Sequence, residues 1–262
     1  MSIKRIKAIL LHEAFVMRHS FEVINDIVIY PLLQIVIFGF LTIYLFGFSG
    51  KLVGSYVLIG TLLWQIISIT QYSISVGCLW DVWSRNLTNI FISPISTAEY
   101  FVSYMISGTI KSIFMFCLAG YLSFRIFHFN ILNIGIVNLL LFFANLAIFA
   151  FAFGIIILGL IFRFGSRISA FAWAMIGIVQ PLMAVIYPVN ILPKPLQAVA
   201  YLFPPTYIFE AARNSISDPS VQWSYILKAL SLNLVFFLLA IIFFNYMFDL
   251  SKKLGQFARL EG

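Results

Sequence analysis

The sequence has 262 residues, of which 62% are hydrophobic and 10% are charged, and its formal net charge is +7. Soluble domains usually carry about 25% charged residues, so this composition, with a mean hydropathy of +1.04, excludes a water-soluble domain and indicates an integral membrane protein. Excess positive charge can attract nucleic acid, but in a membrane protein it is expected on loops that face the anionic cytoplasmic leaflet. We therefore expect one all-α membrane domain over residues 1–262 and no nucleic-acid partner.

Residues 3–21 have the pattern of an amphipathic helix. Apolar residues such as Ile3, Ile6 and Ile9 recur in turns, and charged residues lie between them. This pattern suits a helix that lies in the plane of the membrane interface better than one that spans the membrane. Asp26 follows this segment, and we interpret it as a helix-start residue at the interface rather than as part of a proton relay.

Six apolar stretches follow, most of them close to the ~20 residues that a helix needs to cross about 30 Å of hydrocarbon. Such stretches are expected to be helical because lipid offers no partner to unpaired backbone amides. Their limits are 27–46, 52–76, 100–123, 134–162, 168–187 and 229–248. The sequence therefore predicts six transmembrane helices.

The segment between the last two stretches is apolar but interrupted by prolines. It is too short to cross the membrane and return as two full helices. We expect residues 191–205 to form a short re-entrant or interfacial helix on the outer side, followed by a polar loop over 206–224. The prolines that we assign to an outer gate are Pro193, Pro195, Pro204 and Pro205.

An even number of crossings places both ends of the chain on one side of the membrane. If that side is cytoplasmic, it holds the basic residues of the amino-terminal segment, of 79–96, of 163–167 and of the carboxyl-terminal tail. The opposite side holds a smaller set: Lys51, Arg125, Lys194, Arg213 and Lys228. The positive-inside rule therefore favours cytoplasmic termini.

Residues 79–96 connect the second and third stretches and mix aromatic, charged and small polar residues before a Ser-Pro step. Asp81 and Arg85 lie four residues apart, so they can pair on one face of a helix. A short helix that projects from the membrane in this way could dock into a groove of a soluble partner. The alternative is a plain connecting loop with two interfacial tryptophans.

This segment resembles the loop between the second and third spans of ABC-2-type transporter permeases, where a short coupling helix precedes an apolar-x-Ser-Pro-apolar-Ser turn. Residues 187–193, 202–207 and 210–213 resemble a second family pattern, P-x(n)-L-P … P-x-T-Y … E-x-x-R, between the fifth and sixth spans. With the basic amphipathic amino end, the resemblance covers nearly the whole chain in order. Many members have a glycine in the coupling helix, where this chain has Asn86 and Leu87.

The resemblance implies a homodimer of permeases joined to two ATPase subunits, which bind the ATP and Mg²⁺. It places the contact with the ATPase at Asp81, Trp83, Arg85, Asn86, Leu87 and Pro94. The chain has no G-x-x-x-x-G-K-[ST] phosphate loop, so ATP hydrolysis is expected on a separate polypeptide. Permeases of this size with an interfacial amino-terminal helix are similar to the exporters of O-antigen, capsule and teichoic acid.

Three sets of residues are candidates for handling a lipid-linked polysaccharide. The basic residues that would attract its pyrophosphate head group are Lys4, Arg5, Lys7 and Arg18. Lys111 lies near the middle of the third span, where a bare ammonium costs at least ~2.5–3.5 kcal/mol, so it should face a water-filled path or a partner within the protein. Aromatic residues that could stack on sugars, or could simply face lipid, are Tyr30, Tyr44, Tyr56, Trp64 and Tyr72.

The fifth stretch carries small residues along one side: Ser166, Ala170, Ala174 and Gly177. Small residues let helices approach closely in a membrane. This stripe could form part of a seam between two copies of the chain, or it could pack within one chain.

We therefore expect a transport subunit with no catalytic, cofactor-binding or metal-binding residues, in a bacterial plasma (inner) membrane. One alternative is the same architecture exporting a drug, a peptide or an ordinary lipid. A second is an intramembrane transferase, which would need clustered His, Asp or Glu where this chain has scattered ones. A third is a passive channel or secondary carrier, which would work without any ATPase.

Overall fold

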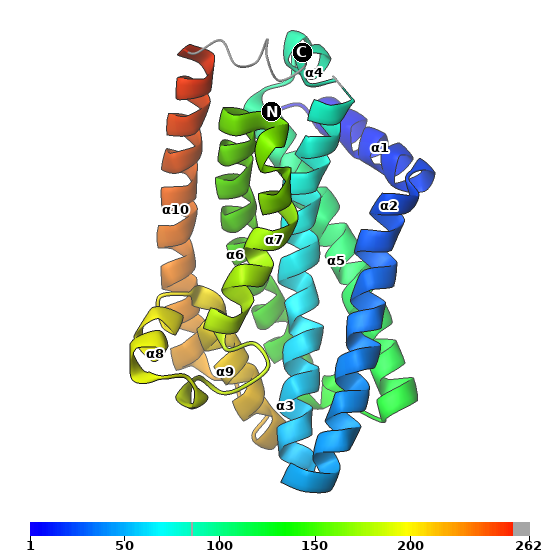
Figure 1. Cartoon of the computed structure of the whole chain (residues 1–262), viewed down its shortest axis with the longest axis vertical. Helices are drawn as coiled ribbons and strands as arrows, with labels where there is room; N and C mark the ends of the chain where they lie inside the picture. The colour runs from blue at the N-terminus through cyan, green and yellow to red at the C-terminus, as the bar shows by residue number, and fades with distance from the viewer. Residues whose placement is uncertain (85, 254–262) are drawn as a thin grey trace.

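The computed structural model describes residues 1–84 and 86–253, and every regular element in this part of the chain is a helix (Figure 1). Five of the helices are long and apolar enough to cross a membrane: Phe21–Leu45, Gly54–Trp83, Thr97–Phe127, Ile136–Phe164 and Trp223–Lys253. The prediction of an all-α chain is confirmed, and the five helices are compatible with a multi-pass membrane protein.

The amino-terminal part of the chain forms a helical hairpin preceded by a separate helix. Its elements are α1 (Ile3–His19), α2 (Phe21–Ile24), the π-helix η1 (Asn25–Ile29) and α3 (Tyr30–Trp83). Figure 1 shows α1 lying obliquely across one end of the bundle, while α2, η1 and the start of α3 continue one another along it. We call the end of the bundle where α1 lies the α1 end.

The long helix α3 reverses direction near its middle. A straight helix of its 54 residues would be about 80 Å long. Instead, the hydroxyl of Thr42 donates to the carbonyl of Gly54 at 3.1 Å, and Gln65 Nε2 donates to Gln34 Oε1 at 3.3 Å. The two parts therefore run antiparallel, and we call residues 21–45 limb one and residues 54–83 limb two.

Limb two lies at the centre of the bundle, between limb one, α5 (Thr97–Phe127) and α6 (Ile136–Phe164). In its most apolar stretch 89% of the residues are buried, against 28% in limb one. A glycine permits one of these contacts, because a β-carbon at Gly108 of α5 would lie 3.1 Å from the carbonyl oxygen of Thr70. The centre of the bundle is therefore closely packed.

The helices α6 and α10 (Trp223–Lys253) run in the same direction along each other. Asn233 Nδ2 donates to Asn145 Oδ1 at 3.2 Å, and these residues are 88 positions apart. The hydroxyl of Ser251 donates to the carbonyl of Phe162 at 2.6 Å, 89 positions apart. Because this offset is nearly constant, the helices are parallel, and the chain between them must travel back from the α1 end to the opposite end.

This return segment consists of short elements rather than one long helix. In order they are η3 (Gly165–Ile168), α7 (Ser169–Val179), η4 (Gln180–Met183), η5 (Val189–Ile191), α8 (Lys194–Ala200) and α9 (Pro204–Ser217). Residues 169–183 span only about 22 Å as a helix, short of a full crossing. The expected continuous span over 168–187 is therefore not found. Pro181 explains the break, since it lacks an amide hydrogen and its ring opposes the α-helical path.

The prolines of the return segment begin helices. Pro193 precedes α8 and Pro195 lies in its first turn, while Pro204 and Pro205 form the first turn of α9, where a missing amide hydrogen costs little. A short helix, α8, thus lies within the segment 191–205, where one was expected. The expected polar loop over 206–224 is wrong, because residues up to Ser217 form a helix that packs against α6 and α10. Small and apolar residues such as Ala212 and Phe209 let it be buried there.

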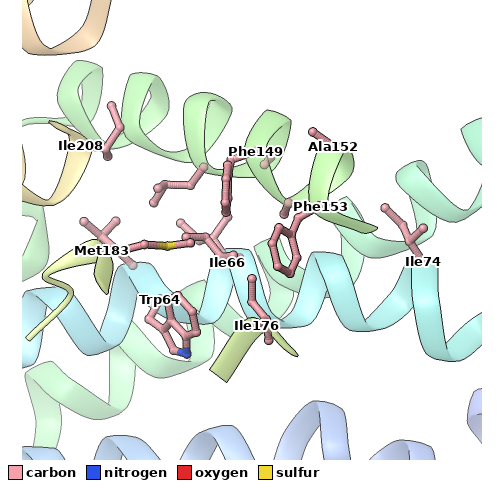
Figure 2. Close-up of a cluster of buried hydrophobic side chains, with 14 of the residues drawn as sticks. Trp64, Ile66, Ile74, Phe149, Ala152, Phe153, Ile176, Met183 and Ile208 are labelled. Atoms are coloured by element: carbon pink, nitrogen blue, oxygen red, sulfur yellow. The ribbon is translucent and has the colours of Figure 1, made fainter. Parts of the chain in front are cut away.

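The core of the bundle joins helices that are distant in sequence. Figure 2 shows Ile66 of limb two, Phe149 of α6, Met183 after α7 and Ile208 of α9 converging on one cluster. Met183 and Ile208 are fully buried, so the return segment is part of the core. The start of the chain and the last turn of α10 lie at the same end of the bundle (Figure 1).

Candidate functional site

A cavity of about 340 Å³ lies between limb one, limb two and α7. Its size is at the lower end of the range for small-molecule sites. We call it the limb cavity, and it is lined by Asp26, Tyr30, Pro31, Gln34, Trp64, Gln65, Ser68, Ile69, Gln71, Tyr72, Ala172, Trp173, Ile176, Gly177 and Gln180. Three segments that are far apart in sequence therefore contribute polar and aromatic groups to one space.

A carboxylate lies at one end of this cavity. Asp26 belongs to the π-helix η1, an element that is rare and often occurs at functional sites. Its Oδ2 accepts a hydrogen bond from the Tyr72 hydroxyl at 2.9 Å and one from Trp173 Nε1 at 3.2 Å, and its Oδ1 accepts from Asn25 Nδ2 at 3.2 Å. All three donors are neutral, and none of the ion pairs among the described residues includes Asp26.

Amide side chains form the middle of the cavity. Gln65 donates to Gln34 across the two limbs at 3.3 Å. Gln71 Nε2 donates to the carbonyl of Ala172 at 3.1 Å and to the hydroxyl of Ser75 at 2.6 Å, which ties limb two to α7. An unpaired amide buried among apolar helices would cost free energy, so these bonds fix the walls of the cavity.

Aromatic rings border the same space. Trp64 is buried, whereas Tyr30 and Trp173 are exposed. The Trp173 ring stacks on Trp83, with centroids 5.7 Å apart and an interplanar angle of 21°. Flat apolar faces beside amides and a carboxylate suit a ligand that has both rings and hydroxyl groups. No group of three or more His, Cys, Asp or Glu side chains within the described residues could hold a metal ion.

The structure brings together only some of the expected pathway residues. Tyr30, Trp64 and Tyr72 line the limb cavity, whereas Tyr44, Tyr56 and Lys111 do not. Several other residues line the cavity but were not expected there: Asp26, Gln34, Gln65, Gln71, Trp173 and Gln180. The signal that could have found most of them is the set of glutamines within apolar stretches, because a buried amide needs a partner.

A second polar cluster holds α1 against α5 and limb two, and we call it the α1 network (Glu13, Asp81, Tyr100, Tyr104 and Lys111). Lys111 Nζ lies 2.7 Å from Glu13 Oε2, and both side chains are largely buried. The hydroxyls of Tyr100 and Tyr104 donate to Asp81 Oδ2 at 2.7 and 2.6 Å. Lys111 therefore has a partner within the chain, which removes its charge from the expected water-filled path.

The expected coupling residues fall in two places. Asp81 is only 1% exposed, so it lies inside the bundle and not on a projecting helix, because Tyr100 and Tyr104 enclose it. Arg85, its expected partner, lies outside the described residues, as does the side chain of Leu87. Beyond Asn86 a short separate helix, α4 (Leu87–Ile92), stands at the α1 end (Figure 1).

The surface around α4 is apolar in part. Ile92 is 78% exposed, Trp83 is 41% exposed, and Pro94 is also exposed. The part of residues 79–96 that a partner could reach is therefore α4 and its neighbours rather than Asp81.

Three of the four expected head-group residues are exposed on α1: Lys4, Lys7 and Arg18. Arg5 differs, because its Nη1 lies 3.4 Å from Glu99 Oε2. Glu99 also accepts from the backbone amides of Ser2 at 2.6 Å and Ser96 at 2.9 Å. Arg5 therefore helps to anchor the start of α1 to the start of α5.

The expected outer-gate region is fixed by a buried charge pair. Arg213 Nη2 lies 2.9 Å from Glu210 Oε1, and Arg213 Nη1 donates to the carbonyl of Val185 at 3.3 Å. Burial lowers the pKa of the Arg213 guanidinium from its usual value and Glu210 opposes that shift, so the group stays protonated. A β-carbon at Gly60 would overlap the same Val185 carbonyl. Of the expected gate prolines, Pro193 and Pro195 are exposed, whereas Pro204 and Pro205 are buried.

The small residues of α7 are exposed rather than packed against other helices. Ala170, Ala174 and Gly177 are exposed, and a β-carbon at Gly177 would meet no atom within 4 Å. The side chain of Ser166 lies outside the described residues. The stripe therefore does not form a packed seam within one chain, and Gly177 also borders the limb cavity.

No protein-family model matches the chain, and no curated protein matches it.

Proposed function

We propose that this chain is the transmembrane permease subunit of an ATP-driven exporter of the ABC-2 type, and that it moves a lipid-linked polysaccharide outward across the bacterial plasma membrane. The observation that carries the proposal is the limb cavity, where aromatic rings, amides and one carboxylate line a space between apolar helices. A membrane protein that only packs its helices has no need of such a space, because polar groups within lipid are costly unless they serve a ligand or a path.

The chain then crosses the membrane six times. The return segment completes the crossing that α7 begins, which fits the parallel course of α6 and α10. In this arrangement α1 lies in the cytoplasmic interface, α8 lies near the outer side, and both termini are cytoplasmic. The exposed Lys4, Lys7 and Arg18 of α1 then face anionic lipid head groups or a pyrophosphate.

The working complex contains two copies of this chain and two ATPase subunits, which supply ATP and Mg²⁺ binding. The exposed small residues of α7 lie beside the limb cavity, so a second copy seated there would bring two cavities together. At the α1 end, the exposed Ile92 and Trp83 around α4 offer an apolar surface for the ATPase. The α1 network would transmit the movement of α4 to α1 and α5.

The proposal is tested by purifying the chain from its native host under mild conditions and identifying what accompanies it. We expect an ATPase that carries a phosphate loop, and we expect ATP-dependent movement of glycan by the reconstituted complex. Ile92→Glu should reduce recovery of the ATPase, because α4 would then present a charge to an apolar contact. Leu132→Glu, just beyond the other end of α5, should not. If the chain alone moves its cargo uphill in vesicles, the proposal is wrong. If the complex moves a drug or an ordinary lipid instead of glycan, the ATPase partnership in the proposal stands and the proposed cargo is wrong.

A further inference from the structure

We infer that the limb cavity selects an uncharged, hydroxyl-rich sugar unit and disfavours acidic sugars, with the Asp26 carboxylate as the recognition group. This inference rests on the proposed function, in that a glycan passes this site, and it narrows the class of glycan. It follows from the charge of the lining, the free acceptor capacity of Asp26 and the nature of the other polar groups.

The charge of the lining is negative. Asp26 is the one carboxylate among the residues that border the cavity, and none of these residues is Lys or Arg. Lys111, the cation expected in the path, is 2.7 Å from Glu13 and is not part of the lining. An acidic sugar that enters would therefore meet a like charge, with no cation in the lining to offset it.

Asp26 keeps the capacity to accept another hydrogen bond. An ionised carboxylate has about four acceptor positions on its two oxygens. Tyr72 and Trp173 both donate to Oδ2, and Asn25 donates to Oδ1. These neutral donors hold the group in place without cancelling its charge. A sugar hydroxyl is a donor that fits the position left over on Oδ1, and this bond would be charge-assisted.

Most of the remaining polar side chains are amides, which can both donate and accept, and the hydroxyls of Tyr30 and Ser68 can do the same. Gln65 Nε2 donates to Gln34 Oε1 at 3.3 Å, and Gln180 also lines the cavity, as does Gly177. A sugar hydroxyl also donates and accepts, so amides and hydroxyls can satisfy one another in either direction. The exposed ring of Trp173 provides an apolar face beside them. An uncharged sugar ring matches every component of this lining.

The test uses the full-length chain alone, in discs of zwitterionic lipid, and follows tryptophan fluorescence, because Trp64 and Trp173 border the cavity. The two probes are maltotetraose, which is neutral, and tetragalacturonate, which is acidic and of equal length. We expect the neutral probe to bind at least tenfold more tightly. Asp26→Asn should weaken binding of the neutral probe by about tenfold, because a charge-assisted bond is lost, and should reduce the preference against the acidic probe.

Glu22→Gln provides the matched comparison, since Glu22 is an exposed carboxylate one turn earlier on α2 and outside the lining. It should leave both affinities unchanged. Equal or tighter binding of the acidic probe to the unaltered chain overturns the inference. So does an Asp26→Asn variant in which the ratio of the two affinities, neutral to acidic probe, is unchanged. The absence of a fluorescence response to either sugar also overturns it. If the inference fails while an ATPase co-purifies and glycan is exported, the proposed function stands. If no ATPase is found, the proposed function fails whatever the ratio is.

Discussion

Asp81 of the α1 network and Asp26 of the limb cavity are two carboxylates that accept hydrogen bonds from neutral side chains. Asp81 accepts from Tyr100 and Tyr104 at 2.7 and 2.6 Å. Asp26 accepts from Tyr72 and Trp173 at 2.9 and 3.2 Å. The chemistry is the same, but the space around the two groups differs. The open space beside Glu13 and Lys111 is about 10 Å³, whereas the limb cavity measures about 340 Å³.

This difference separates polar groups that serve the fold from polar groups that serve a ligand. In the α1 network the charge of Lys111 is met by Glu13, and packing encloses the pair. In the limb cavity the chain fixes Asp26 and the glutamines but leaves them beside open space. Substitutions in the first cluster should therefore act mainly on stability, and substitutions at the rim of the second should act mainly on transport.

The largest effect is expected for Lys111→Met. This change leaves the Glu13 carboxylate buried without its cation, and breaking a buried pair in this way typically costs about 3–5 kcal/mol. Thermal unfolding in lipid discs measures the loss, and faster protease cleavage before α2 would report release of α1. The double variant Glu13→Gln with Lys111→Met should recover most of the loss. Lys228→Met, at an exposed lysine of α10, should change little; a similar loss there would contradict the special role of the pair.

The next effect is expected for Tyr104→Phe, which removes one donor from Asp81 and keeps the ring. Leaving a buried acceptor with one donor fewer costs about 1–3 kcal/mol, and Tyr104 is fully buried. The unfolding midpoint should fall accordingly. Tyr121→Phe on the same helix is the control, because Tyr121 is 60% exposed and should tolerate the change within about 0.5 kcal/mol. Equal midpoints for the two variants would mean that Asp81 does not depend on Tyr104.

The contrast between the clusters also marks the limit of what the sequence predicts. The long helices follow from apolar length alone, so most of the predicted stretches correspond to helices that could span a membrane. The Asp81–Arg85 pairing relied on local spacing, but the donors to Asp81 come from α5, 19 and 23 positions away. Likewise, Lys111 requires a partner, but nothing local to it indicates Glu13, 98 positions away. Long-range partners depend on how the helices pack, which a single sequence does not specify.

The return segment and the cavity were difficult for different reasons. Pro181 explains why α7 ends early. Because proline also occurs within membrane helices, its presence in the sequence does not predict how long this helix is. The moderate polarity of α9 predicts a loop, but Glu210 and Arg213 form an ion pair within the fold. The position of Asp26 at the start of a limb indicates an interfacial residue, and nothing in it points to Trp173, 147 positions away. Tyr30, Trp64 and Tyr72 were predicted as pathway residues because a sequence shows which residues are aromatic, although it does not show which residues are in contact.

Gln71→Met tests a residue that lines the limb cavity but whose amide hydrogen-bonds to other groups of the chain. Gln71 is 1% exposed, and its amide joins limb two to the Ala172 carbonyl of α7. Loss of this bond should cost about 1 kcal/mol and loosen α7, which hydrogen exchange of α7 amides would detect. Gln180→Met, at a half-buried position of the rim, should leave stability nearly unchanged. If the two variants have equal stability, Gln71 belongs with the ligand-facing groups.

The smallest effect on stability, combined with a large effect on transport, is expected for Gly177→Leu. A β-carbon at Gly177 meets nothing within 4 Å, and leucine favours a helix more than glycine does, so the unfolding free energy should change by no more than about 0.5 kcal/mol. The added side chain would occupy the border of the limb cavity and the outward face of α7, and glycan export should fall at least tenfold. Gly108→Leu is the matched glycine in the packed centre, where the nearest atom is 3.1 Å from the β-carbon, and it should cost about 1–3 kcal/mol. Normal export by a stable Gly177→Leu protein would mean that the space beside α7 is not on the path of the cargo. The proposal that the limb cavity serves a ligand, whereas the α1 network serves stability, would then be wrong.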